Sequence, residues 1–200
     1  MTIIIALRTD AESVAMVELG ASDSSKTWVY LCGLTEHINS EQEVENRSIL
    51  DTLGKRLNLR FLAIHPFYRC GRVNYKLCWP HYTPEQTLDV FDTILTVVRD
   101  EQISGYIGFS NGGFFLNQLS QMKELSLPII TIGAAGSYFE PSVSNNLTII
   151  VGKLEPIYGS ARALYRNAKN SPLSVTFIEH DGSHIIPSNT LEKLMRESHS

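Results

Sequence analysis

A serine flanked by glycines is the first feature of this chain that could do chemistry. Gly108-Phe109-Ser110-Asn111-Gly112 has the spacing G-x-S-x-G and directly follows an apolar segment. This spacing is typical of a sharp strand-to-helix turn that exposes a serine hydroxyl, because glycines let the two elements approach closely. The pattern therefore predicts that Ser110 is a nucleophile. The alternative is a plain strand-helix turn whose small residues serve packing.

A serine hydroxyl needs a base, and histidine is the usual one. Three histidines follow Ser110 in the sequence: His180, His184 and His199. His199 is the next-to-last residue of the sequence, where precise positioning is rare. His180 is close to the end of the last expected strand, whereas His184 lies at the tip of a loop that Gly182 loosens. We predict His184 as the base and His180 as a structural residue.

An acid should orient the histidine, in the chain order serine, acid, histidine. Glu155 fits this order, because it follows the apolar segment 147–151 and precedes Pro156. Glu140, which follows the preceding apolar segment, is the alternative acid. Asp181 is too near His184 in sequence to be preferred.

Attack by a serine creates a negatively charged oxygen, which backbone N–H groups can stabilise. The Asn111 amide, at the start of the helix expected after Ser110, is one predicted donor. The other should follow the segment 28–32, where Gly33 makes a sharp exit, and we predict the Leu34 amide. His37, slightly further on, is a candidate for the pocket wall or an ordinary solvated histidine.

The segment 66–84 combines aromatic and cationic side chains and is the predicted specificity loop. It contains Phe67, Tyr68, Arg69, Arg72, Tyr75, Lys76, Trp79 and Tyr82. Such a loop could bind an acyl or aromatic group and an anionic end of a substrate, and we predict substrate contacts for Tyr68 and Trp79. The alternative is that the aromatic residues pack on the edge of the sheet.

Apolar segments of strand length alternate with segments of helical period, and these elements must position the candidate residues. The expected strands are 3–7, 14–19, 28–32, 59–65, 105–109, 128–132, 147–151 and 174–178. The expected helices are 40–57, 83–103, 113–122, 161–168 and 189–196. This alternation predicts a mainly parallel sheet with helices on both faces. The connection 8–13 is too short for a crossover, so the first two strands should pair antiparallel at one edge.

Two local signals define helix starts. Ser40 followed by Glu43 has the spacing of a capping box, and Thr83 followed by Pro84 is typical of an N-cap and first turn.

The composition predicts one domain over residues 1–200, since no linker interrupts a chain that is 43% hydrophobic and 19% charged. A net charge of -4 offers no basic surface for nucleic acid. The first apolar segment, of about five residues, is too short for a signal peptide or a membrane span, which favours a cytoplasmic location.

The cysteines and histidines do not suggest a cofactor. No cluster has the spacing of a zinc site, so we predict neither metal nor organic cofactor. The chain has three cysteines, too few for a disulfide framework. Cys70 and Cys78 flank a loop and could form one bridge, but we expect reduced thiols.

These motifs resemble the α/β-hydrolase family over essentially the whole chain. "GFSNGG" resembles the nucleophile elbow, "VGKLEP" the segment that carries the acid, and "DGSH" the Gly-x-His of the final loop. The resemblance implies an α/β fold of about eight mostly parallel strands, with Ser110, Glu155 and His184 as nucleophile, acid and base. Two features depart from the family. The acid is a glutamate where aspartate is usual, and Cys32-Gly33 stands where His-Gly is common.

The compact chain is most similar to the small carboxylesterases, lysophospholipases and dienelactone hydrolases. About ten to fifteen residues separate the sixth and seventh expected strands, which leaves no room for a large lid. The leading hypothesis is a serine hydrolase that cleaves a small carboxylic ester or thioester through an acyl-enzyme. One alternative is hydrolysis of an amide or carbon–carbon bond, and another is a non-catalytic binding or receptor protein with this fold.

Overall fold

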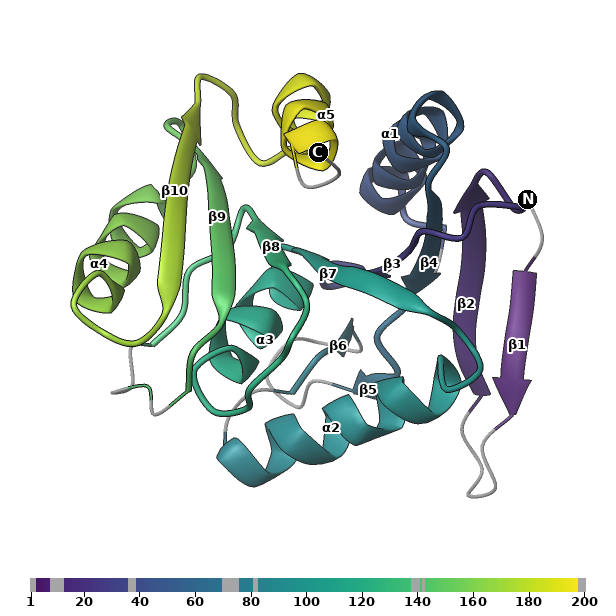
Figure 1. Cartoon of the computed structure of the whole chain (residues 1–200), viewed down its shortest axis with the longest axis horizontal. Coiled ribbons are helices and arrows are strands. Elements are labelled where there is room, and N and C mark those ends of the chain that lie inside the picture. Colours follow the sequence, from purple (N-terminus) through teal and green to yellow (C-terminus); the bar gives the residue numbers. More distant parts are fainter. Residues whose placement is uncertain are drawn as a thin grey trace.

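The computed structural model describes residues 3–7, 13–35, 39–69, 76–80, 83–137, 141 and 143–197. Its centre is an eight-stranded sheet with the order β1-β2-β4-β3-β7-β8-β9-β10 (Figure 1). The strands are β1 (Ile3–Leu7), β2 (Ser13–Gly20), β3 (Thr27–Leu31), β4 (Arg60–Ile64), β7 (Ile103–Phe109), β8 (Ile129–Ile132), β9 (Asn146–Gly152) and β10 (Ser174–His180). The helices are α1 (Glu41–Leu57), α2 (Pro84–Val97), α3 (Asn111–Leu119), α4 (Tyr158–Ala168) and α5 (Ser188–Glu197).

The sheet is parallel except at β2. This strand pairs antiparallel with β1 on one side and with β4 on the other. All other neighbouring strands pair parallel. The structure therefore confirms the predicted mainly parallel sheet with an antiparallel start.

Helices cover both faces of the sheet, and successive strand residues face opposite sides. On β3, Val29 and Leu31 belong to one hydrophobic cluster and Trp28 and Tyr30 to the other. The first cluster includes buried residues of α2, α3 and α4, and the second includes buried residues of α1 and α5. Figure 1 shows α1 and α5 together on one side, with α2 and α3 on the other.

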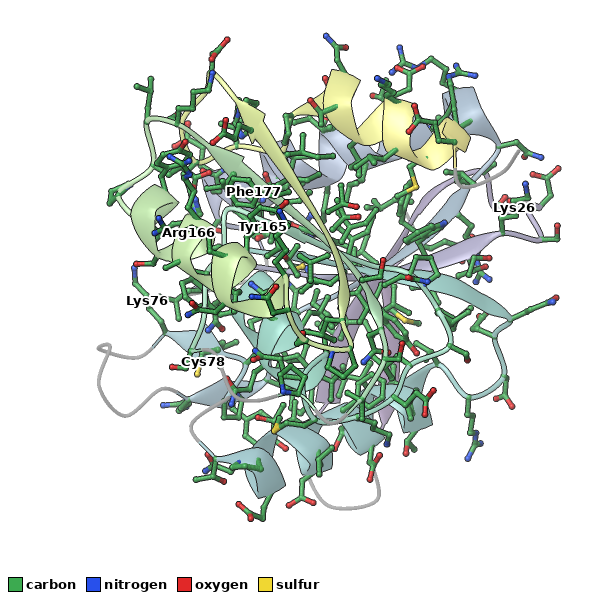
Figure 2. All side chains as sticks on the ribbon, turned by 60° about the vertical axis from the view of Figure 1, so that its left-hand side comes forward. Lys26, Lys76, Cys78, Tyr165, Arg166 and Phe177 are labelled. Carbon is green, nitrogen blue, oxygen red and sulfur yellow. The ribbon has the colours of Figure 1, made fainter. Side chains whose placement is uncertain are left out.

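Helix α4 covers the end of the sheet next to β10. Tyr165 of α4 stacks on Phe177 of β10 with 5.1 Å between ring centroids, and Figure 2 labels both side chains. A groove of about 540 Å³ lies beside this stack, and a second cavity of about 300 Å³ lies between β2 and α1. The lining residues described for these two cavities include none of Ser110, Glu155 and His184.

Two local expectations are corrected by the structure. The helix expected to extend to residue 103 ends at Val97, and β7 already begins at Ile103. The capping box is absent at α1, because the Ser40 side chain makes no cap hydrogen bond. By contrast, the Thr83 side chain does accept a hydrogen bond from the Gln86 amide, as its N-cap spacing predicts.

The specificity loop contains a short hairpin that the sequence did not predict, formed by β5 (Tyr68–Arg69) and β6 (Leu77–Cys78). Cys78 is disulfide-bonded, which corrects the expectation of reduced thiols, whereas Cys32 is a buried free thiol. Cys70 lies outside the described residues. Within the described chain, no helix is long and apolar enough to cross a membrane.

Candidate active site

The three residues predicted for catalysis follow the carboxyl ends of three strands in the parallel part of the sheet. Ser110 follows β7, Glu155 follows β9 and His184 follows β10. Parallel strands place these ends at one edge of the sheet, where α/β proteins usually bind ligands. Backbone hydrogen bonds join the strand ends there: Ser110 N to Ile132 O, Gly133 N to Ile150 O, and Lys153 N to His180 O, each 2.9 Å.

Ser110 occupies a backbone conformation that a serine rarely adopts, with φ 52° and ψ -117°. The glycines on either side allow this turn. A Cβ on Gly108 would lie 2.5 Å from the Gly112 oxygen, and one on Gly112 would lie 2.3 Å from the Leu31 oxygen. The turn therefore has the strained strand-to-helix geometry that the G-x-S-x-G spacing predicts.

Glu155 and His184 form a direct pair. His184 Nδ1 lies 2.6 Å from Glu155 Oε2, and the Glu155 side chain is fully buried. The other carboxylate oxygen accepts a hydrogen bond of 2.8 Å from the Gly152 amide. With both oxygens engaged, the carboxylate is fixed and can hold the imidazole in one orientation and one tautomer.

His184 lies against the residue that precedes Ser110. Its ring centroid is 4.6 Å from that of Phe109. Within the described residues, no hydrogen bond joins the Ser110 hydroxyl to His184. Such bonds are often long before substrate binds, so the geometry is compatible with a serine and base that come together on the substrate.

The other candidate histidine and acids lie elsewhere. His180 Nδ1 accepts a hydrogen bond of 3.1 Å from the Gly182 amide, and burial lowers its pKa. This contact agrees with a structural role in the loop. Asp181 forms an exposed ion pair with Lys153. Glu140 and His199 lie outside the described residues.

The two predicted oxyanion donors lie on either side of Ser110. Asn111 is the first residue of α3, and a Cβ on Gly33 would lie 3.3 Å from the Cβ of Ser110. The segment that carries Leu34 is therefore adjacent to the serine. In the described chain, neither the Leu34 nor the Asn111 amide donates a hydrogen bond.

Trp79 does not contact a substrate pocket, because the structure buries it completely. Its indole N–H donates to the Cys32 carbonyl at 2.8 Å, and its amide donates to Asn111 Oδ1 at 2.7 Å. The predicted substrate contact of Trp79 is therefore wrong, and this residue instead links β6 to β3 and α3.

The aromatic neighbours of Trp79 pack on one another. Tyr68 is partly buried, with its ring centroid 4.7 Å from that of Phe67, which in turn lies 5.6 Å from the Trp79 ring. These contacts favour the packing alternative for this part of the loop. His37, Arg72, Tyr75 and Tyr82 lie outside the described residues.

The sequence did not predict a buried polar cluster behind the segment that follows β3. Its members are Tyr30, Cys32, Glu43, Asn46, Arg47 and His65, each at most 3% exposed. Burial raises the pKa of Tyr30 and of Cys32, with the Glu43 carboxylate acting in the same direction. The sequence offered one signal for this cluster. Glu43, the glutamate of the predicted capping box, could equally have faced the interior.

Among the described residues, no three His, Cys, Asp or Glu side chains gather as a metal ion would require.

Solved structures show the same fold. A carboxylesterase from Bacillus cereus matches with 15% identity and a TM-score of 0.66, covering 93% of both chains. SOBER1 from Arabidopsis thaliana matches with 12% identity and a TM-score of 0.67, covering 88% of this chain and 99% of that one. XC6422 from Xanthomonas campestris, described as an α/β serine hydrolase without a lid, matches with 14% identity and a TM-score of 0.60, covering 98% of this chain and 92% of its own.

Identities this low establish the fold alone, and no curated protein matches the chain in sequence. The family evidence comes from the model of the family described as Serine hydrolase (FSH1), which matches residues 73–195. This match runs from the region of β6 to α5 and includes Ser110, Glu155 and His184. Since it spans more than half of the chain, the protein belongs to the serine hydrolase (FSH1) family and has an α/β-hydrolase fold.

Proposed function

We propose that this serine hydrolase cleaves small carboxylic esters or thioesters through an acyl-enzyme on Ser110. The observation that carries the proposal is the buried Glu155 carboxylate 2.6 Å from His184, at the sheet edge where Ser110 occupies a strained turn. A serine, a histidine and a fixed carboxylate are the groups that acyl transfer needs.

The first half of the reaction forms the acyl-enzyme. The Ser110 hydroxyl oxygen attacks the carbonyl carbon while His184 Nε2 takes the hydroxyl proton. The carbonyl oxygen becomes negative and accepts hydrogen bonds from the Asn111 and Leu34 amides. Glu155 accepts a hydrogen bond from the Nδ1–H of His184 and stabilises the imidazolium. His184 then gives its proton to the leaving alcohol or thiol as the bond to the carbonyl carbon breaks.

The second half releases the acid. Water attacks the acyl carbon, and His184 takes a proton from it. The second tetrahedral intermediate collapses, the bond to Ser110 breaks, and the serine oxygen recovers the proton from His184. No redox step occurs, and the net reaction consumes one water.

Two features support small substrates. The connection from β8, which ends at Ile132, to β9, which begins at Asn146, has no room for a large lid. The His184 side chain is 41% exposed, so the site is open to solvent. The name of the Bacillus cereus structure, a carboxylesterase, adds support for ester chemistry.

The test is labelling by a fluorophosphonate probe, followed by turnover of p-nitrophenyl esters of increasing acyl length and of an acyl thioester. We expect the wild type to label and turn over, and Ser110→Ala and His184→Ala to do neither. Glu155→Gln should lower kcat by about 10⁴-fold, as loss of the orienting acid does in serine proteases. Asp181→Asn, which changes an exposed acid of the loop that carries His184, is the control and should keep full activity.

A folded wild type that neither labels nor hydrolyses any of these substrates would contradict the proposal and favour the binding-protein alternative. Labelling without ester or thioester turnover would instead direct attention to amide or carbon–carbon substrates.

A further inference from the structure

Glu43 is a buried carboxylate directly behind the segment that follows β3. It lies in the first turn of α1 and is 2% exposed. Its side chain does not cap the helix. Instead, Oε1 accepts a hydrogen bond of 2.7 Å from the Gly33 amide.

The remaining partners of Glu43 are neutral. Oε2 accepts from the Tyr30 hydroxyl at 3.2 Å, and Asn46 Nδ2 lies 3.5 Å from Oε1. Among the described residues, no Lys, Arg or His forms an ion pair with Glu43.

A carboxylate in such a place needs an explanation. Burial of a charge that forms no ion pair is costly, and well-packed apolar residues often replace buried ionic groups without loss of stability. The positive end of the α1 dipole and the three donors offset part of this cost. Packing alone does not require a polar side chain here, which points to a role for the hydrogen bond that Oε1 accepts from the Gly33 amide.

Hydrogen bonds on both sides bracket Leu34, and on one side is the bond from the Gly33 amide to Glu43. On the other side, the Thr35 amide donates to the Leu77 carbonyl at 3.2 Å, and the Leu77 amide donates back at 2.7 Å. The Leu34 amide between them donates to no group in the described chain. Gly33 itself lies against Ser110, since a Cβ there would be 3.3 Å from the serine Cβ.

We infer that Glu43 is a positioning residue that holds the Gly33 amide and thereby aims the Leu34 N–H at the substrate oxygen. This inference rests on the proposed function, because it assigns Leu34 as an oxyanion donor. Donors of this kind accelerate a reaction only if they are oriented before the charge develops. Glu43 and Leu77 supply that orientation from opposite sides of the peptide.

Two variants separate the effect of the length of the Glu43 side chain from the effect of its charge. Glu43→Gln keeps an oxygen within reach of the Gly33 amide but removes the charge, whereas Glu43→Asp keeps the charge and shortens the side chain by one methylene. Loss of an oxyanion donor lowers kcat by about 10²–10³-fold, so a loosened donor should lower it by about 10–100-fold. We expect this loss in Glu43→Asp, with KM for p-nitrophenyl acetate nearly unchanged, and a loss of less than about fivefold in Glu43→Gln.

Tyr30→Phe is the matched control. It removes another buried partner of the same carboxylate without touching Gly33, so it should lower the melting temperature but keep kcat. Thermal unfolding establishes that each variant is folded, and labelling by the fluorophosphonate probe confirms that Ser110 is intact.

A folded Glu43→Asp with wild-type kcat would overturn the inference, as would an equal loss of kcat in Tyr30→Phe. If Glu43→Asp does not fold, a folded Glu43→Gln whose kcat falls more than about 30-fold overturns it, since charge and not reach would then matter. Failure of the wild type to label contradicts the proposed function, whereas wild-type turnover that is insensitive to Glu43 contradicts this inference alone.

Discussion

Gly133, the residue that follows β8, determines how closely the Glu155–His184 pair can approach the sheet. A Cβ at this position would lie 2.7 Å from His184 Nδ1 and 3.0 Å from Glu155 Oε2. Its φ of 59° also lies in the region that favours glycine. The pair therefore depends on a residue without a side chain.

We predict that Gly133→Ala lowers kcat by about 10–100-fold, because the added methyl group displaces the imidazole from its position beside Phe109. Backbone strain should also lower the free energy of unfolding by about 1–3 kcal/mol. Steady-state kinetics with a p-nitrophenyl ester and urea denaturation measure the two effects. Gly159→Ala is the control, since a Cβ there meets nothing within 4 Å. Equal kcat values for the two variants would refute this role of Gly133.

At the scale of single residues, the sequence predicted where the candidate catalytic residues lie along the chain better than it predicted which groups a side chain contacts. Ser110, Glu155 and His184 could be nominated because each follows an apolar segment in a fixed chain order. Glu43 could not be nominated, because the spacing of Ser40 and Glu43 fits a local cap as well as a contact with β3. Only the placement of α1 against β3 separates these two possibilities.

At the scale of elements, the β5–β6 hairpin links both sides of the oxyanion region. Leu77 pairs with Thr35 after β3, and the Trp79 amide donates to Asn111 Oδ1 at the start of α3. The Trp79 indole also holds the Cys32 carbonyl. Movement of this hairpin would therefore disturb both proposed amide donors.

Trp79→Phe should test this connection. The variant keeps an aromatic ring but leaves the Cys32 carbonyl without the indole N–H, which should lower the free energy of unfolding by about 1–3 kcal/mol. We expect kcat to fall about tenfold, since loosened donors stabilise the oxyanion less well. Phe67→Leu is the control, because Phe67 packs on Trp79 but forms no hydrogen bond to β3 or α3 in the described chain. The outcome that would count against the prediction is a similar fall in kcat for both variants.

The main elements were predictable because the sheet is covered on both faces. Most of its strands are rich in apolar residues, and the sequence identified all eight. Strands β5 and β6 have two residues each, too few to show a period. The burial of Trp79 could not be predicted, since a loop rich in aromatic residues has the same sequence pattern whether its side chains pack inward or contact a ligand.

At the scale of the whole molecule, one buried histidine makes stability depend on pH. His65 is 1% exposed, and burial and the nearby Arg47 lower its pKa to about 4. Arg47 Nη1 lies 3.3 Å from His65 Nε2, and the Cys32 sulfur lies 3.8 Å from the same atom. The folded protein therefore keeps His65 neutral at pH values where an unfolded chain would protonate it.

The sign of the effect follows from proton binding. Between pH 6.5 and about 4, the unfolded chain binds a proton at this histidine and the folded chain does not. The free energy of unfolding should thus fall as the pH falls through this range, by up to about 3 kcal/mol from His65. Urea denaturation at several pH values measures this slope. His65→Gln, which cannot titrate, should flatten it, and an unchanged slope would show that other groups are responsible.

The order of the strands also has a consequence for how activity appears during refolding. The serine turn needs β7 and its neighbours in the middle of the sheet, whereas His184 follows β10, an edge strand that pairs only with β9. An edge strand gains contacts on one side only. A chain that recovers from denaturant can therefore form its strained serine turn before it has a base. We therefore expect hydrolysis to return only when β10 has joined β9, and chains that contain the central sheet without β10 in place should remain inert towards substrate.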